Sequence, residues 1–178
     1  GTMLATVGDY AARIWDPTTG DEVHAVEVPG DEVWGPSFSP DGSLFAAVWP
    51  GVVRVLDLAS GRIVREIRSV TGAFRTSFDP SGSRIVVSSR EQPRAVVLDV
   101  ESGDEVLSLE GHLYGLLDVA WSPDGTSIAT SSFDGSARIF DARTGRQRFA
   151  LLGHLGSVSS VAWSPDSKSI AYVQGGLD

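Results

Sequence analysis

The chain has 178 residues, of which 42% are hydrophobic and 21% charged, an ordinary composition for one globular domain with its own core. Its formal net charge of −9 at pH 7 argues against a nucleic-acid partner, because nucleic acids are bound by basic surfaces. The absence of cysteine excludes disulfides, thiolate metal sites and a cysteine nucleophile. No apolar run approaches the roughly 20 residues of a membrane helix, so we expect no membrane partner and a cytoplasmic protein.

Short apolar runs bounded by turn-forming residues predict strands along the whole chain. The first three predicted strands are Leu4–Val7, Ala12–Trp15 and Val23–Val28. The region 111–152 has the clearest pattern, with strands predicted at Leu116–Trp121, Ser127–Ser132, Ala137–Phe140 and Gln147–Leu151. The last two are predicted at Val158–Ser164 and Ser169–Val173. Three strands joined by tight turns bury too little surface to be stable alone, so such a unit should be repeated.

The pattern does repeat with a period near 42 residues. A turn sequence of the type Ser-Pro-Asp-Gly starts at Ser39, Asp79, Ser122 and Ser164, at intervals of 40 to 43 residues. An Asp that closes the third strand recurs at Asp16, Asp57, Asp99 and Asp141. A polar fourth strand follows each closing Asp, as at Ile63–Arg68 and Glu105–Leu109. Four strands in about 42 residues are typical of one blade of a β-propeller.

Over essentially its whole length the chain resembles the WD-repeat family. Gly111-His112 and Gly153-His154 match the Gly-His of that family, and Trp15-Asp16 matches its Trp-Asp pair. The segment SPDSKSIAYV also resembles propellers with Pro-Asp-Gly repeats, but the Gly-His pairs and the closing Asp favour the WD type. The resemblance implies a single all-β propeller domain over residues 1–178. It would contain a partial blade at 4–29, full blades at 31–69, 70–110 and 111–152, and closing strands at 153–175.

The resemblance also implies a hydrogen-bonded tetrad in the blade 111–152. Its members would be His112, Thr130 (or Ser132 on the same face), Asp134 and Phe140. Because phenylalanine has no N–H group, we expect this tetrad to be incomplete at Phe140. A buried polar network stabilises the fold only when each member is satisfied. The middle blades have no Gly-His and no turn Asp, so they should depend on apolar packing instead.

The partial blade predicts how the propeller closes. Asp9 and Trp15 have no preceding Gly-His, whereas His154 has no following Trp-Asp. We expect His154 to meet Asp9 and Trp15 when the ends join, because closure removes an unpaired sheet edge. Two chains that exchange ends would form an eight-bladed ring with two-fold symmetry. A four-bladed monomer and a fragment of a longer array are the alternatives. Closure leaves a surplus second strand, since such a strand is predicted at both ends of the chain and one copy must be displaced or disordered.

In WD-repeat proteins, residues at the start of the innermost strand and before the turn Asp face the top surface. In this chain the residues so placed, and therefore expected to bind a partner, are Glu32, Trp34, Phe74, Arg75, Leu117 and Phe133. Aromatic residues and arginine dominate interface hot spots. Trp34 and Phe74 could instead pack between blades.

The sequence contains no catalytic or phosphate-binding motif, so we expect neither an enzyme nor a cofactor or metal site. We interpret the protein as a non-enzymatic scaffold that binds a protein or peptide on its top face. Two alternatives are a propeller fragment whose main property is self-assembly and the sensor module of a larger regulator. The step from fold to function rests on the resemblance alone.

Overall fold

The computed structural model describes residues 3–68, 70–153 and 156–175, and within these it contains strands, turns and loops. Three four-stranded antiparallel sheets form its middle part, and their strands follow chain order from one edge to the other. The first sheet comprises β3 (Trp34–Phe38), β4 (Leu44–Trp49), β5 (Val52–Asp57) and β6 (Arg62–Ile67). The second comprises β7 (Ala73–Phe78), β8 (Arg84–Ser89), β9 (Arg94–Asp99) and β10 (Glu105–Glu110). The third comprises β11 (Leu116–Trp121), β12 (Ser127–Ser132), β13 (Ala137–Asp141) and β14 (Gln147–Leu151).

A two-stranded sheet lies at each end of the described chain. At the N-terminal end β1 (Leu4–Trp15) pairs with β2 (Glu22–Glu32), and at the C-terminal end β15 (Val158–Trp163) pairs with β16 (Ile170–Gln174). The indole Nε1 of Trp15 donates a hydrogen bond of 2.9 Å to Thr6 Oγ1, nine residues earlier in β1. Nine residues of extended strand would span roughly 30 Å, so β1 folds back on itself. It therefore contains both strands predicted at Leu4–Val7 and Ala12–Trp15.

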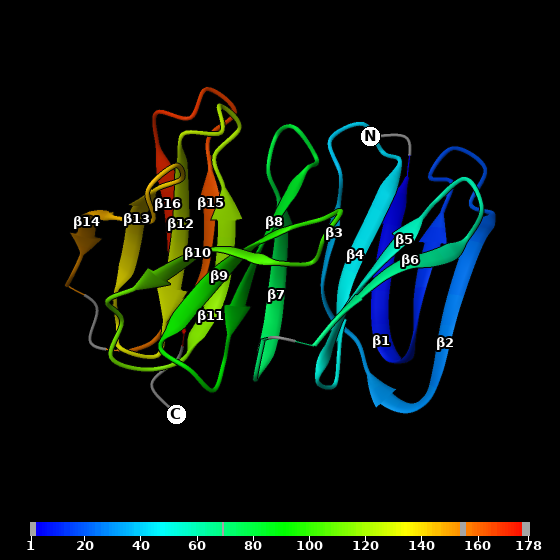
Figure 1. Ribbon diagram of the computed structural model, residues 1–178, viewed down its shortest axis with the longest axis horizontal. Helices are drawn as coiled ribbons and strands as arrows, with labels where there is room; N and C mark the ends of the chain where they lie inside the picture. The colour runs from blue at the N-terminus through cyan, green and yellow to red at the C-terminus, as the bar shows by residue number, and fades with distance from the viewer. Residues whose placement is uncertain (1–2, 69, 154–155, 176–178) are drawn as a thin grey trace.

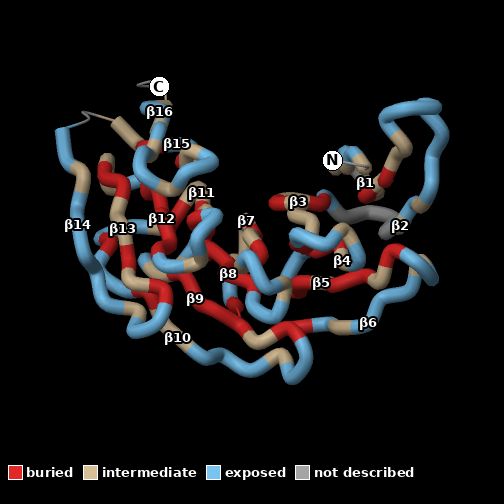
Figure 2. The backbone as a smooth tube through the Cα atoms, turned by 90° about the horizontal axis from the view of Figure 1, so that it is seen from above, coloured by how far each residue is buried: buried red, intermediate tan, exposed pale blue. Residues whose placement is uncertain are grey.

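The sheets are arranged as an open arc around a central axis (Figures 1 and 2). In Figure 2 the first strands β3, β7, β11 and β15 lie on the inner side of the arc, and β6, β10 and β14 lie on the outer side. The β1–β2 sheet and the β15–β16 sheet lie at its two ends (Figure 2). The prediction of an all-β propeller built from four-stranded antiparallel blades is therefore confirmed.

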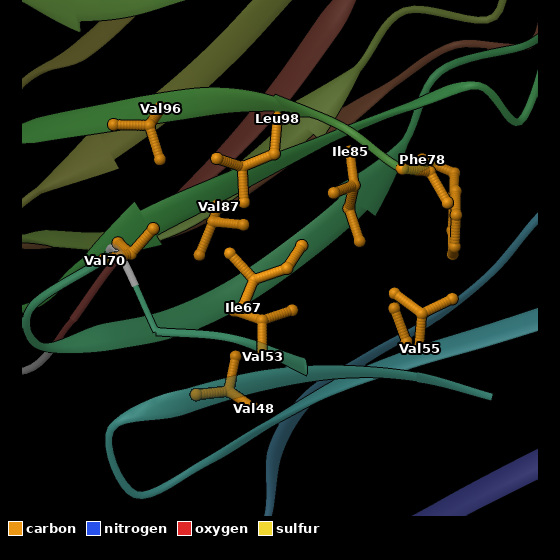
Figure 3. Packing of buried hydrophobic residues seen from close by; sticks show 12 residues of the cluster. Val48, Val53, Val55, Ile67, Val70, Phe78, Ile85, Val87, Val96 and Leu98 are labelled. Carbon is orange, nitrogen blue, oxygen red and sulfur yellow. The ribbon is translucent and has the colours of Figure 1, made fainter. Parts of the chain in front are cut away.

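The core consists of four apolar clusters, each between two neighbouring sheets. Figure 3 shows the cluster between the first two four-stranded sheets, where Val53 and Ile67 face Ile85 and Val96. Similar clusters join the β1–β2 sheet to β3–β6, the second sheet to the third, and the third to β15–β16. Strands β4, β8 and β12 are buried over nearly their whole length because a sheet covers each of their faces. Outer strands such as β14 are largely exposed.

The repeated turn Ser-Pro-Asp-Gly depends on its fourth residue. Gly42, Gly82 and Gly125 have φ angles of 72°, 74° and 74°, a left-handed conformation that glycine adopts without steric cost. The fourth copy has Ser167 at this position with a φ of 59°, and it keeps the same Ser164 to Ser167 hydrogen bond. Ser167 also accepts a hydrogen bond of 3.0 Å from the backbone N–H of Asp124 in the neighbouring sheet. That contact gives the serine a role that glycine could not perform.

Candidate functional site

A buried polar network links the start of the third blade to its second strand and following turn. The structure brings together His112, Thr130 and Asp134, three of the four predicted tetrad residues. His112 Nδ1 lies 2.8 Å from Asp134 Oδ2, and its Nε2 lies 2.8 Å from Thr130 Oγ1. The side chains of His112 and Asp134 are 0% and 3% exposed. The backbone N–H of Leu113 also donates to Asp134, so the network holds the loop before β11 against the turn after β12.

The ionised Asp134 carboxylate determines which ring nitrogen of His112 carries the proton, and burial determines that the ring is neutral. Burial acts to raise the pKa of Asp134, but hydrogen bonds from Ser136, the Leu113 N–H and His112 outweigh it and lower the pKa to about 2. An ionised carboxylate only accepts hydrogen bonds, so Nδ1 of His112 carries the proton and Nε2 accepts from the hydroxyl of Thr130. Burial lowers the pKa of His112 below its ordinary value of 6.5, although Asp134 acts in the opposite direction. The histidine is neutral at pH 7 and serves as a structural bridge.

The fourth predicted tetrad residue, Phe140, is fully buried in the cluster between the second and third sheets. It offers no donor to Thr130, whereas Trp15 donates to Thr6 in the β1–β2 sheet. The alternative Ser132 donates instead to the backbone carbonyls of Tyr114 and Gly115. Of the predicted closure residues, His154 and the side chain of Asp9 lie outside the described part of the chain. Their meeting with Trp15 stays a prediction.

The pKa values of this network predict that the fold loses stability in acid. A histidine whose pKa is lower in the folded than in the unfolded chain stabilises the fold fully only above its unfolded value. The contribution of His112 should therefore be complete above pH 6.5 and decrease as the pH falls below it. That of Asp134 should be complete above its ordinary value of 3.8 and be lost as the pH falls towards about 2.

Urea unfolding between pH 7 and pH 5 measures the His112 part of this effect. The urea midpoint of the unmodified chain is expected to fall over this interval, and the fall should be smaller in His112→Gln. The matched control is His24→Gln, because His24 is only partly buried and lies on the outer strand β2, where its Nε2 is 2.5 Å from the carbonyl of Leu58. An equal pH dependence in all three proteins would contradict this role of His112.

Aromatic and arginine side chains from neighbouring blades stack on one another at the end of the sheets where β3 and β7 begin and β8 and β12 end. We call this end the top face. The rings of Trp34 and Phe74 have centroids 6.3 Å apart and are tilted by 47°. The guanidinium carbons of Arg75 and Arg90 lie 4.8 Å and 4.9 Å from the centre of the Phe74 ring. Arg90 also lies 5.5 Å from the centre of the Phe133 ring. We call these five residues, Trp34, Phe74, Arg75, Arg90 and Phe133, the top-face cluster.

The predicted partner-binding residues differ in their exposure. Phe133 is 43% exposed, and Glu32 is exposed at the end of β2. Trp34, Phe74, Arg75 and Leu117 are half-buried. Trp34 and Phe74 thus pack between blades and still present part of their surface to solvent. In the described part of the chain, no hydrogen bond, ion pair or ring contact joins Glu32 or Leu117 to the top-face cluster.

Arg90 belongs to the cluster but was not among the residues predicted from the sequence. It follows β8 at the position that Phe133 occupies after β12, one residue beyond the end of the strand. Alignment of the repeats would therefore have predicted Arg90 as a top-face residue. The prediction was missed because the turn at Glu91-Gln92 lacks the Asp that marks this position in the third blade. Its role becomes visible only through its contacts with two aromatic rings.

Gly115 allows the third blade to approach Arg90 closely. A Cβ atom at Gly115 would overlap the backbone carbonyl of Arg90, far inside any van der Waals distance. Gly115→Ala is therefore expected to destabilise the fold by about 1–3 kcal/mol, the usual cost of overpacking a filled site. Urea unfolding measures this cost. The control is Gly8→Ala, because Gly8, like Gly115, has no positive φ, and a Cβ there would meet nothing within 4 Å. A loss no larger than that of Gly8→Ala would count against the close approach.

The described residues contain no group of three His, Asp, Glu or Cys residues that could hold a metal ion. Two open pockets of about 520 Å³ and 470 Å³ lie beside His112 and beside Trp34 respectively. The described part of the chain has no helix with the length and apolarity needed to span a membrane.

Comparison with known proteins shows which families and proteins this chain resembles. The family described as "WD domain, G-beta repeat" matches residues 103–141 and 145–175. Coronin-7 of Rattus norvegicus is 36% identical over 145 residues, which cover 78% of this chain and 14% of the relative. The periodic tryptophan protein 2 homolog of Dictyostelium discoideum is 29% identical over 148 residues, covering 78% and 16%.

A solved structure has the same fold as this chain. A chain in the crystal structure of the Mitotic Checkpoint Complex superposes with a TM-score of 0.90 at 24% identity, covering 99% of this chain and 55% of that one. The chain thus spans about half of this structural neighbour and less than a fifth of the two curated relatives. The repeated turns, the blade sheets and these similarities together show that the chain belongs to the WD-repeat β-propeller family.

Proposed function

We propose that the chain is a non-enzymatic scaffold that binds a protein or peptide partner on its top face. The observation that supports this most directly is the top-face cluster, in which aromatic rings and guanidinium groups from three blades share one surface. Such side chains contribute large contact areas at low entropic cost, and they are enriched at binding hot spots. The sheets beneath them are rigid, so the surface is formed before the partner arrives.

The comparisons support the same class of function without naming a partner. WD-repeat propellers bind proteins in general, and the similar solved chain belongs to the Mitotic Checkpoint Complex, a multiprotein assembly. Three residues of the cluster lie at the starts of β3 and β7, and Arg90 and Phe133 follow the ends of β8 and β12, so none is on an exposed outer strand. A partner loop placed there would contact several blades at once.

A pull-down from cell lysate with the purified chain tests the top face as a binding surface. Proteins that the unmodified chain captures from the lysate should be lost with Trp34→Ala and kept with Phe149→Ala. Phe149 is 60% exposed on the outer strand β14, so its removal also deletes an exposed aromatic ring but leaves the top face intact. Both variants should show the circular dichroism of the unmodified chain. Equal capture by both variants would exclude this surface.

A second candidate function is self-assembly into a closed ring of two chains. It is favoured by the open arc of Figure 2, in which the β1–β2 and β15–β16 sheets lie at opposite ends. The first half of β1 and strand β16 would then occupy equivalent places, so one of them has to be displaced when two chains join. Light scattering after gel filtration distinguishes the states: a single species of 18.8 kDa excludes the dimer, and twice that mass supports it.

A further inference from the structure

Two guanidinium groups of the top-face cluster stack on one aromatic ring and have no acidic partner. The guanidinium carbons of Arg75 and Arg90 lie 4.8 Å and 4.9 Å from the centre of the Phe74 ring, so they are at most 9.7 Å apart. In the described part of the chain neither arginine forms an ion pair, although Arg13, Arg54, Arg68, Arg94, Arg138 and Arg148 do.

Other arginines of the described chain also lack an ion pair, but Arg75 and Arg90 are the two whose guanidinium groups share one aromatic ring. The adjacent Glu91 lines the pocket of Trp34 and Arg68. Stacking on an aromatic ring leaves the N–H groups at the edge of a guanidinium free to donate to an anion.

The backbones that carry both arginines are fixed by neighbouring strands. The N–H of Arg90 donates to the carbonyl of Gly72 at 2.8 Å, and its own carbonyl packs against Gly115. The N–H of Arg75 donates to Ser88 Oγ at 3.1 Å, and its Cα lies against Gly35 of the preceding blade. Groups held in place before binding lose little conformational freedom on association.

Exposed apolar side chains lie in the loop that leads to Gly115, the residue that packs against the Arg90 backbone. Leu113 and Tyr114 are 76% and 64% exposed in the loop before β11. The turn that carries Phe133 is fixed against this loop, because the Phe133 N–H donates to the carbonyl of Gly115 at 3.1 Å. Cationic and apolar contacts are therefore available next to each other on one surface.

We infer that Arg75, Arg90 and Phe133 with the loop of Leu113 and Tyr114 bind an acidic peptide segment in which carboxylates adjoin apolar side chains. The carboxylates accept hydrogen bonds from the two guanidinium groups. The apolar side chains cover Phe133 and the exposed loop. This inference rests on the proposed scaffold function and specifies the chemistry of its partner.

Fluorescence anisotropy with defined peptides tests the inference. The probe is a short labelled peptide of alternating Glu and Leu residues, and its partner probe has Gln at each Glu. We expect the Glu peptide to bind and the Gln peptide to bind at least about tenfold more weakly, since hydrogen bonds to charged groups are the stronger ones. Arg90→Gln and Arg75→Gln should each weaken binding of the Glu peptide by about tenfold.

The matched control is Arg143→Gln, which makes the same change of charge at an exposed residue of the β13–β14 connection. It should bind the Glu peptide as the unmodified chain does. Equal binding of the two peptides, or an equal loss with Arg143→Gln, would overturn the inference. Tighter binding of single-stranded DNA through the same two arginines would also overturn it, in favour of a nucleic-acid ligand.

The inference and the proposed scaffold function can fail separately. If Trp34→Ala abolishes capture of proteins but the Glu peptide does not bind, only the acidic chemistry of the partner is wrong. If neither experiment depends on the top face, the scaffold proposal also fails. Circular dichroism of each arginine variant shows that a loss of binding is not a loss of folding.

Discussion

Replacing Asp134 by alanine is expected to lower the free energy of unfolding by about 3–5 kcal/mol, because several donors in a buried site lose a charged acceptor, at about 1–3 kcal/mol each. Asp134 accepts hydrogen bonds from the N–H of Leu113, from Ser136 and from His112. Without the carboxylate these donors remain in a site where its side chain was 3% exposed. Unsatisfied buried donors cost about 1–3 kcal/mol each, and partial entry of water moderates their sum.

Asp166→Ala is the control for this prediction. Asp166 accepts hydrogen bonds from Ser164 and from the N–H of Lys168 in the turn that corresponds to Ser-Pro-Asp-Gly. This residue is exposed, so water can replace the lost acceptor, and the cost should be about 0.5–1.5 kcal/mol. Urea unfolding followed by tryptophan fluorescence measures both variants. Similar losses in the two would show that burial of the His112 network contributes little to stability.

The second large effect is expected at Phe45, whose replacement by alanine should cost about 3–5 kcal/mol, the usual range for a buried phenylalanine. Phe45 is fully buried in the cluster between the β1–β2 sheet and β3–β6, and its ring lies 5.4 Å from that of Phe38. In a repeat protein each unit is stabilised mainly by its neighbours. The cavity left by Phe45→Ala should therefore weaken attachment of the β1–β2 sheet more than any other part.

Hydrogen exchange resolves this effect along the chain. Amide protection in β1 and β2 should fall more than protection in β11–β14, which do not contact the cluster. Phe149→Ala, which removes a ring that is 60% exposed, should change stability by no more than about 0.5 kcal/mol. A uniform loss of protection throughout the chain would mean that the blades unfold as one cooperative unit.

Much of the strand structure was predictable because each repeat marks its own turns. Strands were predicted at Leu116–Trp121 and Ser127–Ser132, and β11 and β12 have these bounds. The outer strand predicted at Ile63–Arg68 lies one residue earlier, as β6 at Arg62–Ile67. Outer strands are exposed and polar, so no apolar pattern fixes their register. Likewise β2 extends to Glu32, four residues beyond the predicted end at Val28.

The parts of the candidate site that belong to a sequence motif could be predicted from the sequence. The Gly-His pair and the turn Asp identified His112 and Asp134, because the repeat places both at the same end of one blade. The partnership of Thr130 with His112, rather than of Ser132, required the structure, since both side chains were expected on one face of β12. The direction of each hydroxyl depends on the loop that packs over it.

The sequence by itself determined the fold, because the 42-residue period sets the strand count, the turns and the buried face of each strand. Only the tertiary structure decided which side chains meet across blades. Arg90 stacks on Phe74 within its own blade and on Phe133 of the next blade, and Trp34 of the preceding blade packs against Phe74. The backbones of neighbouring blades approach closely at Gly35 and Gly115, where the absence of a side chain permits the contact. A periodic pattern describes one blade at a time, whereas the top-face cluster is a property of the contact between blades.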